Sequence, residues 1–441
     1  MRRHLPLALA PLTALALLVG APGPATALGT AHPAVVSDDP VDTTPHVLDG
    51  AVRAVAVVGS RVYVGGSFSS VRDAGSGTTA VARTHLFAYD RATGRVVPGF
   101  APRLDGPVET LAASPDGSSV VVGGRFRTVD GAAQRSLAVL TATGARDTTF
   151  RAATNGIVRK VLVRGERLVL GGRFTKVGGT ARANLAVVHA RTGALDTSFA
   201  VPVTEGRVKS GTATKPSVEE MDADAAGSRL VVVGNFRRVG GQVRQQIAMV
   251  DLAAGSVTGW RTDRYPNDVA GSAMAYQCYQ VFDTQMRDVE FAPDGRWFAV
   301  VTTGGAPDRN RRSLCDTTTR WETAQRLSPA QPEVETWRNC TGGDTLYSVA
   351  VSGSAVYVGG HQRWLDNCGG QDFAVAGSFA APGIGAIHPA TGLAIRSWNP
   401  GRTRGVGAEE LVTDSRGLHV GSDTERLGGE YHARLGFFPL G

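Results

Sequence analysis

The chain repeats one short pattern, and this repeat constrains its fold more than any other feature. An apolar run that ends in a glycine pair and an aromatic recurs as VYVGGSF (62–68), VVVGGRF (120–126) and LVLGGRF (168–174), and as VVVGNF (231–236). Weaker copies end at Gly305, Gly360 and Ser422. Seven copies indicate a repeat architecture, in which each unit buries its apolar surface against its neighbours.

Each repeat is expected to form four short antiparallel strands. An apolar strand and a tight turn precede the glycine pair, as in VETLAASPDGS (108–118), and a third strand follows, as in SLAVLTATG (136–144). The β-branched residues and the Gly or Asp-Gly turns are typical of hairpins. A fourth strand ends in an aromatic residue: Phe100, Phe150, Phe199, Trp260, Trp337 or Trp398.

This organisation predicts an all-β fold, a seven-bladed β-propeller of four-stranded antiparallel blades. Six and eight blades are the alternatives, because the later repeats are degenerate. The last repeat ends at its third strand and lacks a fourth. The segment from Thr44 has the form of a link between two repeats, but no repeat comes before it. We therefore predict that the N-terminal strand, near Pro45 to Leu48, closes the propeller by completing the last blade.

The repeat also has a counterpart in a known family. The string VGGxFxxVxG…R…LAxxxxxTGxxDxxF, clearest in residues 62–75, 120–150 and 168–199, resembles the delta-sixty repeat. That family consists of β-propeller repeats in secreted bacterial proteins, and the later repeats of this chain resemble the second half of actinobacterial surface proteins that carry them. The resemblance implies the fold and secretion, and it implies no reaction.

The N-terminus has the layout of a secretory signal peptide. Arg2 and Arg3 precede an apolar stretch at residues 5–20, and the small-residue site Ala25-Thr26-Ala27 follows it. The apolar stretch is short for a membrane span, and no later segment reaches 18 apolar residues, so we expect no transmembrane segment in the mature chain. The predicted organisation is a signal peptide at 1–27, an N-terminal linker at 28–42 and the propeller at 43–441, with an extracellular location.

The four cysteines agree with export. They are Cys278, Cys315, Cys340 and Cys368, and none forms a CxxC pair or a spacing typical of zinc sites. An even number of cysteines in an oxidising compartment favours two disulfides. Three connectivities exist, and pairing within one blade, Cys278 with Cys315 and Cys340 with Cys368, is the preferred one.

Charge and motifs exclude several functions. Basic residues outnumber acidic ones by 46 to 39, but no basic run exceeds three residues, so no nucleic-acid partner is predicted. The sequence contains no phosphate loop, no HExxH motif and no nucleophile elbow. We predict neither a cofactor nor a metal.

The longest connections between strands fall in repeats four to seven, all on one predicted face of the propeller. Long loops on a rigid scaffold often carry binding sites. The candidate ligand-binding residues in these loops are Tyr279, Trp321, Glu322, His361, Arg363, Trp364, Asp366, Arg402, Arg404, Asp423 and Arg426. The alternative for Trp321 and Trp364 is burial beneath a loop, and for His361 it is a polar core position.

These residues favour a secreted binding module for a carbohydrate or a cell-envelope partner such as a surface protein. Tryptophan offers a flat apolar face to a sugar ring, and Arg and Asp offer directional hydrogen bonds. The alternative is a glycan-active enzyme, a lyase or hydrolase, in which His361, Arg363, Tyr279 and Glu322 provide acid, base and charge neutralisation. No motif fixes their geometry, so a role without catalysis is preferred. A third alternative is a purely structural or adhesive surface domain, since fold alone does not select a function.

A second group of charges lies at equivalent positions in the first strand of each repeat. These positions hold Arg53, Glu109, Arg159, Glu219, Arg287, Tyr347 and Glu409. The sign alternates in the first four repeats, so we predict a ring of ion pairs between neighbouring blades at the mouth of the central channel. The functional alternative is an ion or polar ligand held on the axis.

Overall fold

Every regular element in the described part of the chain is a β-strand. The structure is a computed structural model that describes residues 29–75, 77–209, 212–265, 286–303, 317–324, 331–370 and 372–441. Within these residues no helix is long and apolar enough to cross a membrane. The predicted all-β class is confirmed.

The longer strands form antiparallel sheets of three or four strands, each of which is named by its first strand. The first of them are the β2 sheet, with β2 (Val52–Val58), β3 (Arg61–Gly66) and β6 (Leu86–Asp90); the β7 sheet, with β7 (Val108–Ala113), β8 (Ser119–Gly124) and β11 (Leu137–Thr141); and the β12 sheet, with β12 (Ile157–Arg164), β13 (Arg167–Arg173) and β16 (Leu185–His189).

Four-stranded sheets follow in the middle of the chain and three-stranded ones at its end. The β20 sheet has β20 (Ser217–Ala223), β21 (Arg229–Asn235), β24 (Ile247–Asp251) and β25 (Ser256–Val257), and the β26 sheet has β26 (Met286–Phe291), β27 (Trp297–Thr302), β28 (Thr317–Glu322) and β29 (Trp337–Cys340). The β30 sheet has β30 (Leu346–Val351), β31 (Val356–Gly360) and β34 (Ile384–Ile387), and the β35 sheet has β35 (Ala408–Asp414), β36 (Gly417–Ser422) and β39 (Leu435–Pro439).

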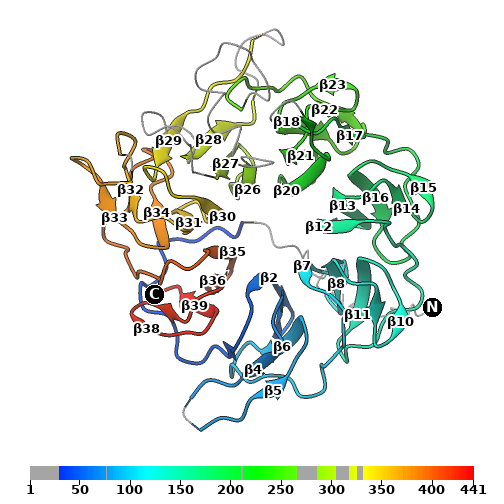
Figure 1. Ribbon diagram of the computed structural model, residues 1–441, viewed down its shortest axis with the longest axis horizontal. Helices are drawn as coiled ribbons and strands as arrows, with labels where there is room; N and C mark the ends of the chain where they lie inside the picture. The colour runs from blue at the N-terminus through cyan, green and yellow to red at the C-terminus, as the bar shows by residue number, and fades with distance from the viewer. Residues whose placement is uncertain are drawn as a thin grey trace, which may run out of the picture.

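The sheets are arranged around a common axis, with the first strand of each nearest the centre (Figure 1). Consecutive first strands contact one another from β2 to β35, and β35 also contacts β2. The apolar core lies between neighbouring sheets; in one cluster, for example, Val52 of β2 packs with Leu435 of β39. The first and last sheets are therefore neighbours in space.

The recurring glycine pair is explained by close packing on both sides of the second strand. A Cβ atom on Gly66 would lie 2.0 Å from the carbonyl oxygen of Ala51, and one on Gly65 would lie 2.4 Å from Val108 of the next sheet. The same contact joins the last sheet to the first, because a Cβ atom on Gly421 would lie 2.7 Å from Val52. Glycine is therefore required where neighbouring sheets approach most closely.

The predicted fourth strand is confirmed in the β20 and β26 sheets, as β25 and β29. In other sheets it is reduced to a single bridge, such as Tyr89 with Val96. The chain then leaves the sheet so that its aromatic residue can enter the core. Phe100, for example, is fully buried, with its ring centre 4.9 Å from that of Tyr63.

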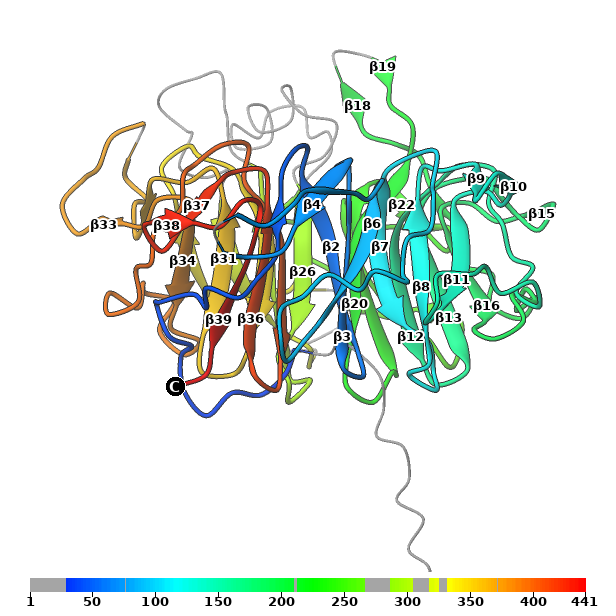
Figure 2. The same ribbon diagram turned by 90° about the horizontal axis from the view of Figure 1, so that it is seen from below.

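Short strands occupy the connections at the end of the molecule where the first strands begin. They are β4 (Ser70–Arg72), β5 (Val81–Ala82), β9 (Thr128–Val129), β10 (Ala132–Ala133), β14 (Lys176–Val177), β15 (Thr180–Ala181), β17 (Val203–Thr204), β22 (Arg238–Val239), β23 (Gln242–Val243), β32 (Trp364–Leu365), β33 (Phe379–Ala380), β37 (Arg426–Leu427) and β38 (Glu430–Tyr431). The hairpin of β18 (Val208–Lys209) and β19 (Thr212–Ala213) projects from this end (Figure 2). We call it the loop end.

The N-terminal segment meets the last sheet differently from the prediction. β1 (His46–Val47) pairs with β4 and not with β39, so the predicted place of the closing strand at Pro45 to Leu48 is wrong. The links between other sheets also pair with such outer hairpins, as Leu104 does with Val129, and β1 is the equivalent of that bridge. Residues further upstream border β39 instead: Ser37 donates to Pro439 and Val41 to Phe437.

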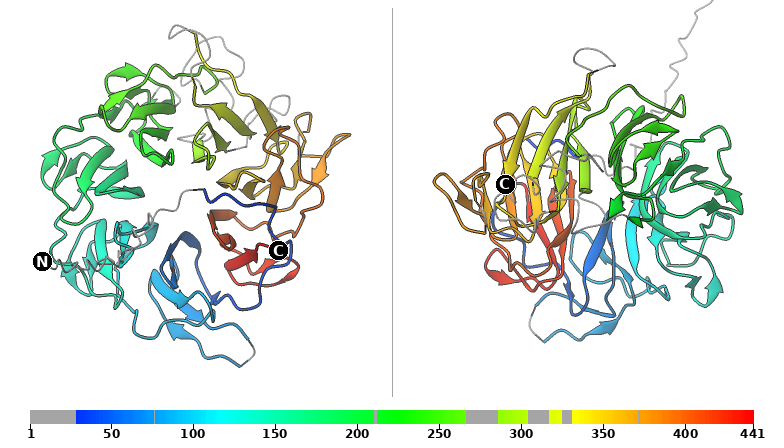
Figure 3. Two further views of the ribbon diagram at one scale, coloured as in Figure 1. Left: turned by 180° about the vertical axis from the view of Figure 1, so that it is seen from behind. Right: turned by 45° about the horizontal axis from the view of Figure 1, so that its top comes forward.

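Residues 29–36, expected to be part of a linker, lie across the end of the sheets opposite the loop end. The backbone of Thr30 donates to the hydroxyl of Thr413, and the backbone of His32 donates to the carbonyl of Ser352. The segment runs from near the axis outward past the C-terminus (Figure 3). It therefore bonds to both the β30 and the β35 sheets.

Candidate functional site

The predicted residues of the last two sheets meet at the loop end around one buried carboxylate. Asp344 accepts two bonds from the guanidinium of Arg363, of 2.8 and 3.1 Å, and one of 3.2 Å from Arg404. Arg404 also donates to the carbonyl of His361. Two arginines and a histidine, separated in the sequence, therefore share one polar cluster.

An aromatic and apolar surface borders this cluster. The guanidinium of Arg363 lies over the ring of Trp364, 4.4 Å from its centre, and Trp364 itself is partly exposed. Arg363 also pairs with Asp372 at 2.9 Å, and the adjacent Phe373 is 55% exposed. Val406, next to the polar cluster, is 54% exposed. We call Asp344, His361, Arg363, Trp364, Phe373 and Arg404 the loop-end cluster.

The disulfide between Cys340 and Cys368 stabilises the connection that carries this cluster. Its two Cα atoms are 4.7 Å apart, and the prediction that these two cysteines pair is confirmed. The other predicted pair, Cys278 with Cys315, lies outside the described residues, as does the candidate Tyr279.

Arg402 is a structural residue and not an exposed ligand contact. Its side chain is 1% exposed and donates to the carbonyls of Gly360 and Arg404 and to the hydroxyl of Thr424. Burial lowers the pKa of Arg402 to about 10. The guanidinium therefore holds the loop-end connections of the last two sheets together.

Three other candidates support loops rather than forming one surface. Asp423 accepts from the backbone amides of Val406 and Gly407. Asp366 pairs with Arg396 at 3.2 Å. The candidate Arg426 is exposed and donates to the carbonyl of Gly429, in the hairpin of β37 and β38.

Trp321 and Glu322 lie elsewhere than predicted. Both belong to β28 and not to a loop, and the end of this strand lies opposite the loop end, because Thr323 bonds to Arg296 in the turn between β26 and β27. Trp321 is fully buried against Trp260, so the buried alternative holds for it. Glu322 pairs with Arg320 and is not near His361.

The predicted ion pairs between neighbouring sheets near the axis are confirmed in part. Arg53 pairs with Glu409 at 2.9 Å and with Glu109 at 3.5 Å, and Arg159 pairs with Glu219 at 2.9 Å. A cavity of about 140 Å³ on the axis is lined by these residues together with Glu220, Met286, Arg287 and Tyr347. The guanidinium of Arg287 lies over the ring of Tyr347, which explains why an aromatic replaces a charge there.

Beneath the ring lies a second layer of charges that the sequence analysis missed. A β-bulge in each first strand, such as that between Val218 and Glu220, turns two consecutive side chains toward the axis. The sequence contains one sign of this second layer, namely two adjacent charged residues in a strand that otherwise alternates, such as Glu219-Glu220. A cavity of about 80 Å³ is lined by Lys160, Arg164, Asp222, Asp288, Glu290 and Glu410.

The carboxyl groups of this layer hold their protons unusually tightly. Burial, together with neighbouring carboxylates, raises the pKa of Glu220 to about 8, that of Glu410 to about 7 and that of Asp288 to about 6. Lys160, whose Nζ lies 2.9 Å from Glu220, partly offsets this effect and has its own pKa raised by the surrounding carboxylates. The axis therefore contains groups that change charge near neutral pH.

No protein-family model matches this sequence, and no curated protein matches it. Among solved structures, the chain is similar to the hydrazine synthase of Kuenenia stuttgartiensis, with 15% sequence identity and a TM-score of 0.41. The match covers 75% of this chain and 78% of the hydrazine synthase chain. The chain is also similar to the computationally designed Ika8 protein, with 12% sequence identity and a TM-score of 0.47. This match covers 91% of this chain and 100% of the Ika8 chain.

Proposed function

We propose that the chain is a secreted seven-bladed β-propeller that binds a carbohydrate or a related cell-envelope ligand. The architecture is supported by the seven sequence repeats, by the contacts between successive first strands and by the packing of Gly421 against Val52. Secretion is supported by the layout of residues 1–27 and by the resemblance to the delta-sixty repeat.

The proposed ligand site is the loop-end cluster. The observation that carries this proposal is the partly exposed indole of Trp364, which is stacked on one side by the guanidinium of Arg363. Sugars present apolar C–H faces that stack on aromatic rings and hydroxyl groups that need directional partners. Arg363, Arg404 and the carboxylate of Asp344 provide such partners beside the aromatic surface.

Binding of the purified full chain to an array of bacterial cell-wall and plant glycans tests this proposal. We expect Trp364→Ala to weaken binding about tenfold or more, as truncation of a central tryptophan commonly does. Leu393→Ala is the matched control, because Leu393 is an apolar residue that is 59% exposed in the turn after β34, at the other end of the molecule. Absence of glycan binding, or equal binding by Trp364→Ala and the wild type, would contradict the proposal.

The same assay distinguishes binding from catalysis. The Nδ1 atom of His361 is 2.5 Å from the carbonyl oxygen of Gly405, which can only accept, so Nδ1 carries a proton and Nε2 is the nitrogen that faces a ligand. A lyase or hydrolase could use such a nitrogen as a base. Turnover of a bound glycan that is lost in His361→Ala would replace the binding role with an enzymatic one.

A further inference from the structure

One position in the outer hairpins holds a bracing arginine in three of the sheets, and the last sheet has a histidine there. In the β2, β12 and β20 sheets an arginine donates to a carbonyl in the following segment, Arg83 to Pro98, Arg182 to Thr197 and Arg244 to Thr258, at 2.7 to 3.3 Å. The equivalent residue in the β35 sheet is His432. Here the imidazole faces the N-terminal segment, with Thr44 and Asp42 beside it.

The Nε2 atom of His432 lacks a hydrogen-bond partner among the described residues, although the residue is only 4% exposed. Its nearest ionic neighbour is Oε2 of Glu430, at 3.5 Å. Burial of an unpaired ring nitrogen is costly, so this atom requires an explanation.

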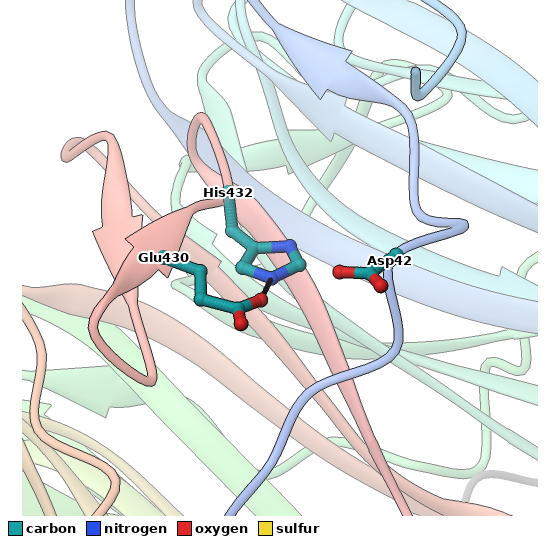
Figure 4. Close-up of side chains that lie close together, drawn as sticks. All are labelled: Asp42, Glu430 and His432. Carbon is teal, nitrogen blue, oxygen red and sulfur yellow. Dashed lines mark ion pairs between the residues drawn. The ribbon is translucent and has the colours of Figure 1, made fainter.

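A second carboxylate lies beside the imidazole and comes from the other end of the chain. Asp42 belongs to the N-terminal segment that borders β39, and Figure 4 shows the imidazole of His432 between Asp42 and Glu430. The potential ligand atoms of the three residues all lie within 4.8 Å of one another. Asp42 and Glu430 are exposed, so their side chains can adjust.

The partner of the other ring nitrogen favours a free lone pair on Nε2. The Nδ1 atom of His432 is 3.4 Å from the hydroxyl of Thr44, and that hydroxyl donates to the carbonyl of Leu435. A hydroxyl that donates to this carbonyl accepts the proton of Nδ1, which leaves the lone pair on Nε2. A hydrogen bond of this kind from the second nitrogen is a regular feature of metal-binding histidines.

We propose that Asp42, Glu430 and His432 bind a divalent transition-metal cation, for which Zn²⁺ is the best fit. One imidazole and two carboxylates form a mixed N/O donor set, and their two negative charges balance the ion. Bonds of about 2.0–2.1 Å in a tetrahedral Zn²⁺ site place ligand atoms about 3.3 Å apart. The 3.5 Å between Nε2 and Glu430 already matches this spacing, and an exposed Asp42 side chain needs to move by about 1–1.5 Å.

Such an ion would fasten the N-terminal segment to the last sheet. The ring of His46 packs against that of Tyr431 next to this site, with 4.8 Å between the ring centres. The guanidinium of Arg72 lies over the ring of Tyr431, which adjoins Glu430 in β38. The site is independent of the loop-end cluster and of any glycan.

Titration of the tag-free, EDTA-treated full chain with ZnCl₂, without reducing agent, tests the proposal. We expect calorimetry to show one Zn²⁺ site per chain and saturating Zn²⁺ to raise Tm by about 2 °C or more. Asp42→Asn keeps the size of an exposed side chain and should weaken binding at least tenfold and abolish the rise in Tm. His432→Gln should do the same.

Asp39→Asn is the matched control, since Asp39 is another exposed carboxylate of the same segment and lies outside the cluster. It should bind Zn²⁺ as the wild type does. Two results would overturn the proposal: no binding by the wild type at 1:1 stoichiometry, or binding that Asp42→Asn leaves unchanged. Because Asp42 is exposed, the Asp42→Asn substitution should leave the folded core intact. A loss of Zn²⁺ binding in this variant therefore reports on the site and not on unfolding.

Discussion

Replacement of Glu410 by glutamine should stabilise this protein above neutral pH. Glu410 faces the axial cavity with Asp288 and Glu290, and burial raises its pKa from 4.5 to about 7. A carboxyl group whose pKa is raised by folding binds its proton more tightly in the folded state. Its contribution to stability is therefore complete below about pH 4.5 and is lost as the pH rises through 7.

The size of the effect follows from this change in pKa. A rise from 4.5 to about 7, at about 1.4 kcal/mol per pKa unit, corresponds to about 3 kcal/mol in the free energy of unfolding. We expect Glu410→Gln to raise the free energy of unfolding at pH 8 by about 1–3 kcal/mol. Glutamine removes the charge and retains an oxygen that can accept the bond from Val55.

Urea unfolding at pH 5, 6, 7 and 8 measures the difference. Glu410→Gln should match the wild type near pH 5 and exceed it at pH 8. Glu219→Gln is the control, because Glu219 forms a partly exposed pair with Arg159 in the ring above and its loss should cost about 0–1 kcal/mol. Equal pH dependence of Glu410→Gln and the wild type, or lower stability of Glu410→Gln at pH 8, would refute the reasoning.

Two further substitutions test other parts of the structure. Replacing both Cys340 and Cys368 by serine opens a loop with a sequence separation of 28 residues, which should lower the free energy of unfolding by about 3–4 kcal/mol in nonreducing urea titrations; an unchanged midpoint would show that the bridge adds no stability. Gly94→Ala should lower Tm by several degrees, because Gly94 has φ +70 and its Cβ would meet the carbonyl of Thr43 at 1.9 Å, whereas Gly99→Ala, with open space around it, should match the wild type. Equal Tm values for Gly94→Ala and Gly99→Ala would contradict the close packing of Gly94 against Thr43.

Position within the repeat explains what could be predicted from the sequence. The ring that contains Arg53 and Glu409 was predictable because every first strand has the same register, so equivalent positions face the axis. The pairing of Cys340 with Cys368 was predictable for the same reason, since both lie at the loop end of one sheet. The all-β class was predictable from the repeated pattern of short apolar strands and tight turns.

Where the repeat is interrupted, the prediction failed. The long insertion before β28 displaced the expected third strand, so Trp321 and Glu322 were assigned to a loop although their alternation of buried and partly exposed residues is that of a strand. The bulges that turn Glu220 toward the axis depend on backbone geometry, and the sequence shows only an adjacent charged pair. The approach of Asp42 to His432 joins opposite ends of the chain, and no local pattern reports such a contact.

Hydrogen exchange of the N-terminal segment tests most directly whether this segment completes the ring of sheets. The amides of Ser37, Val41 and Val47 donate to carbonyls of Pro439, Phe437 and Ala433, each at 2.8–2.9 Å. If the segment is part of the folded ring, these amides should exchange as slowly as those of β39. Complete exchange within seconds at neutral pH, while β36 remains protected, would contradict it.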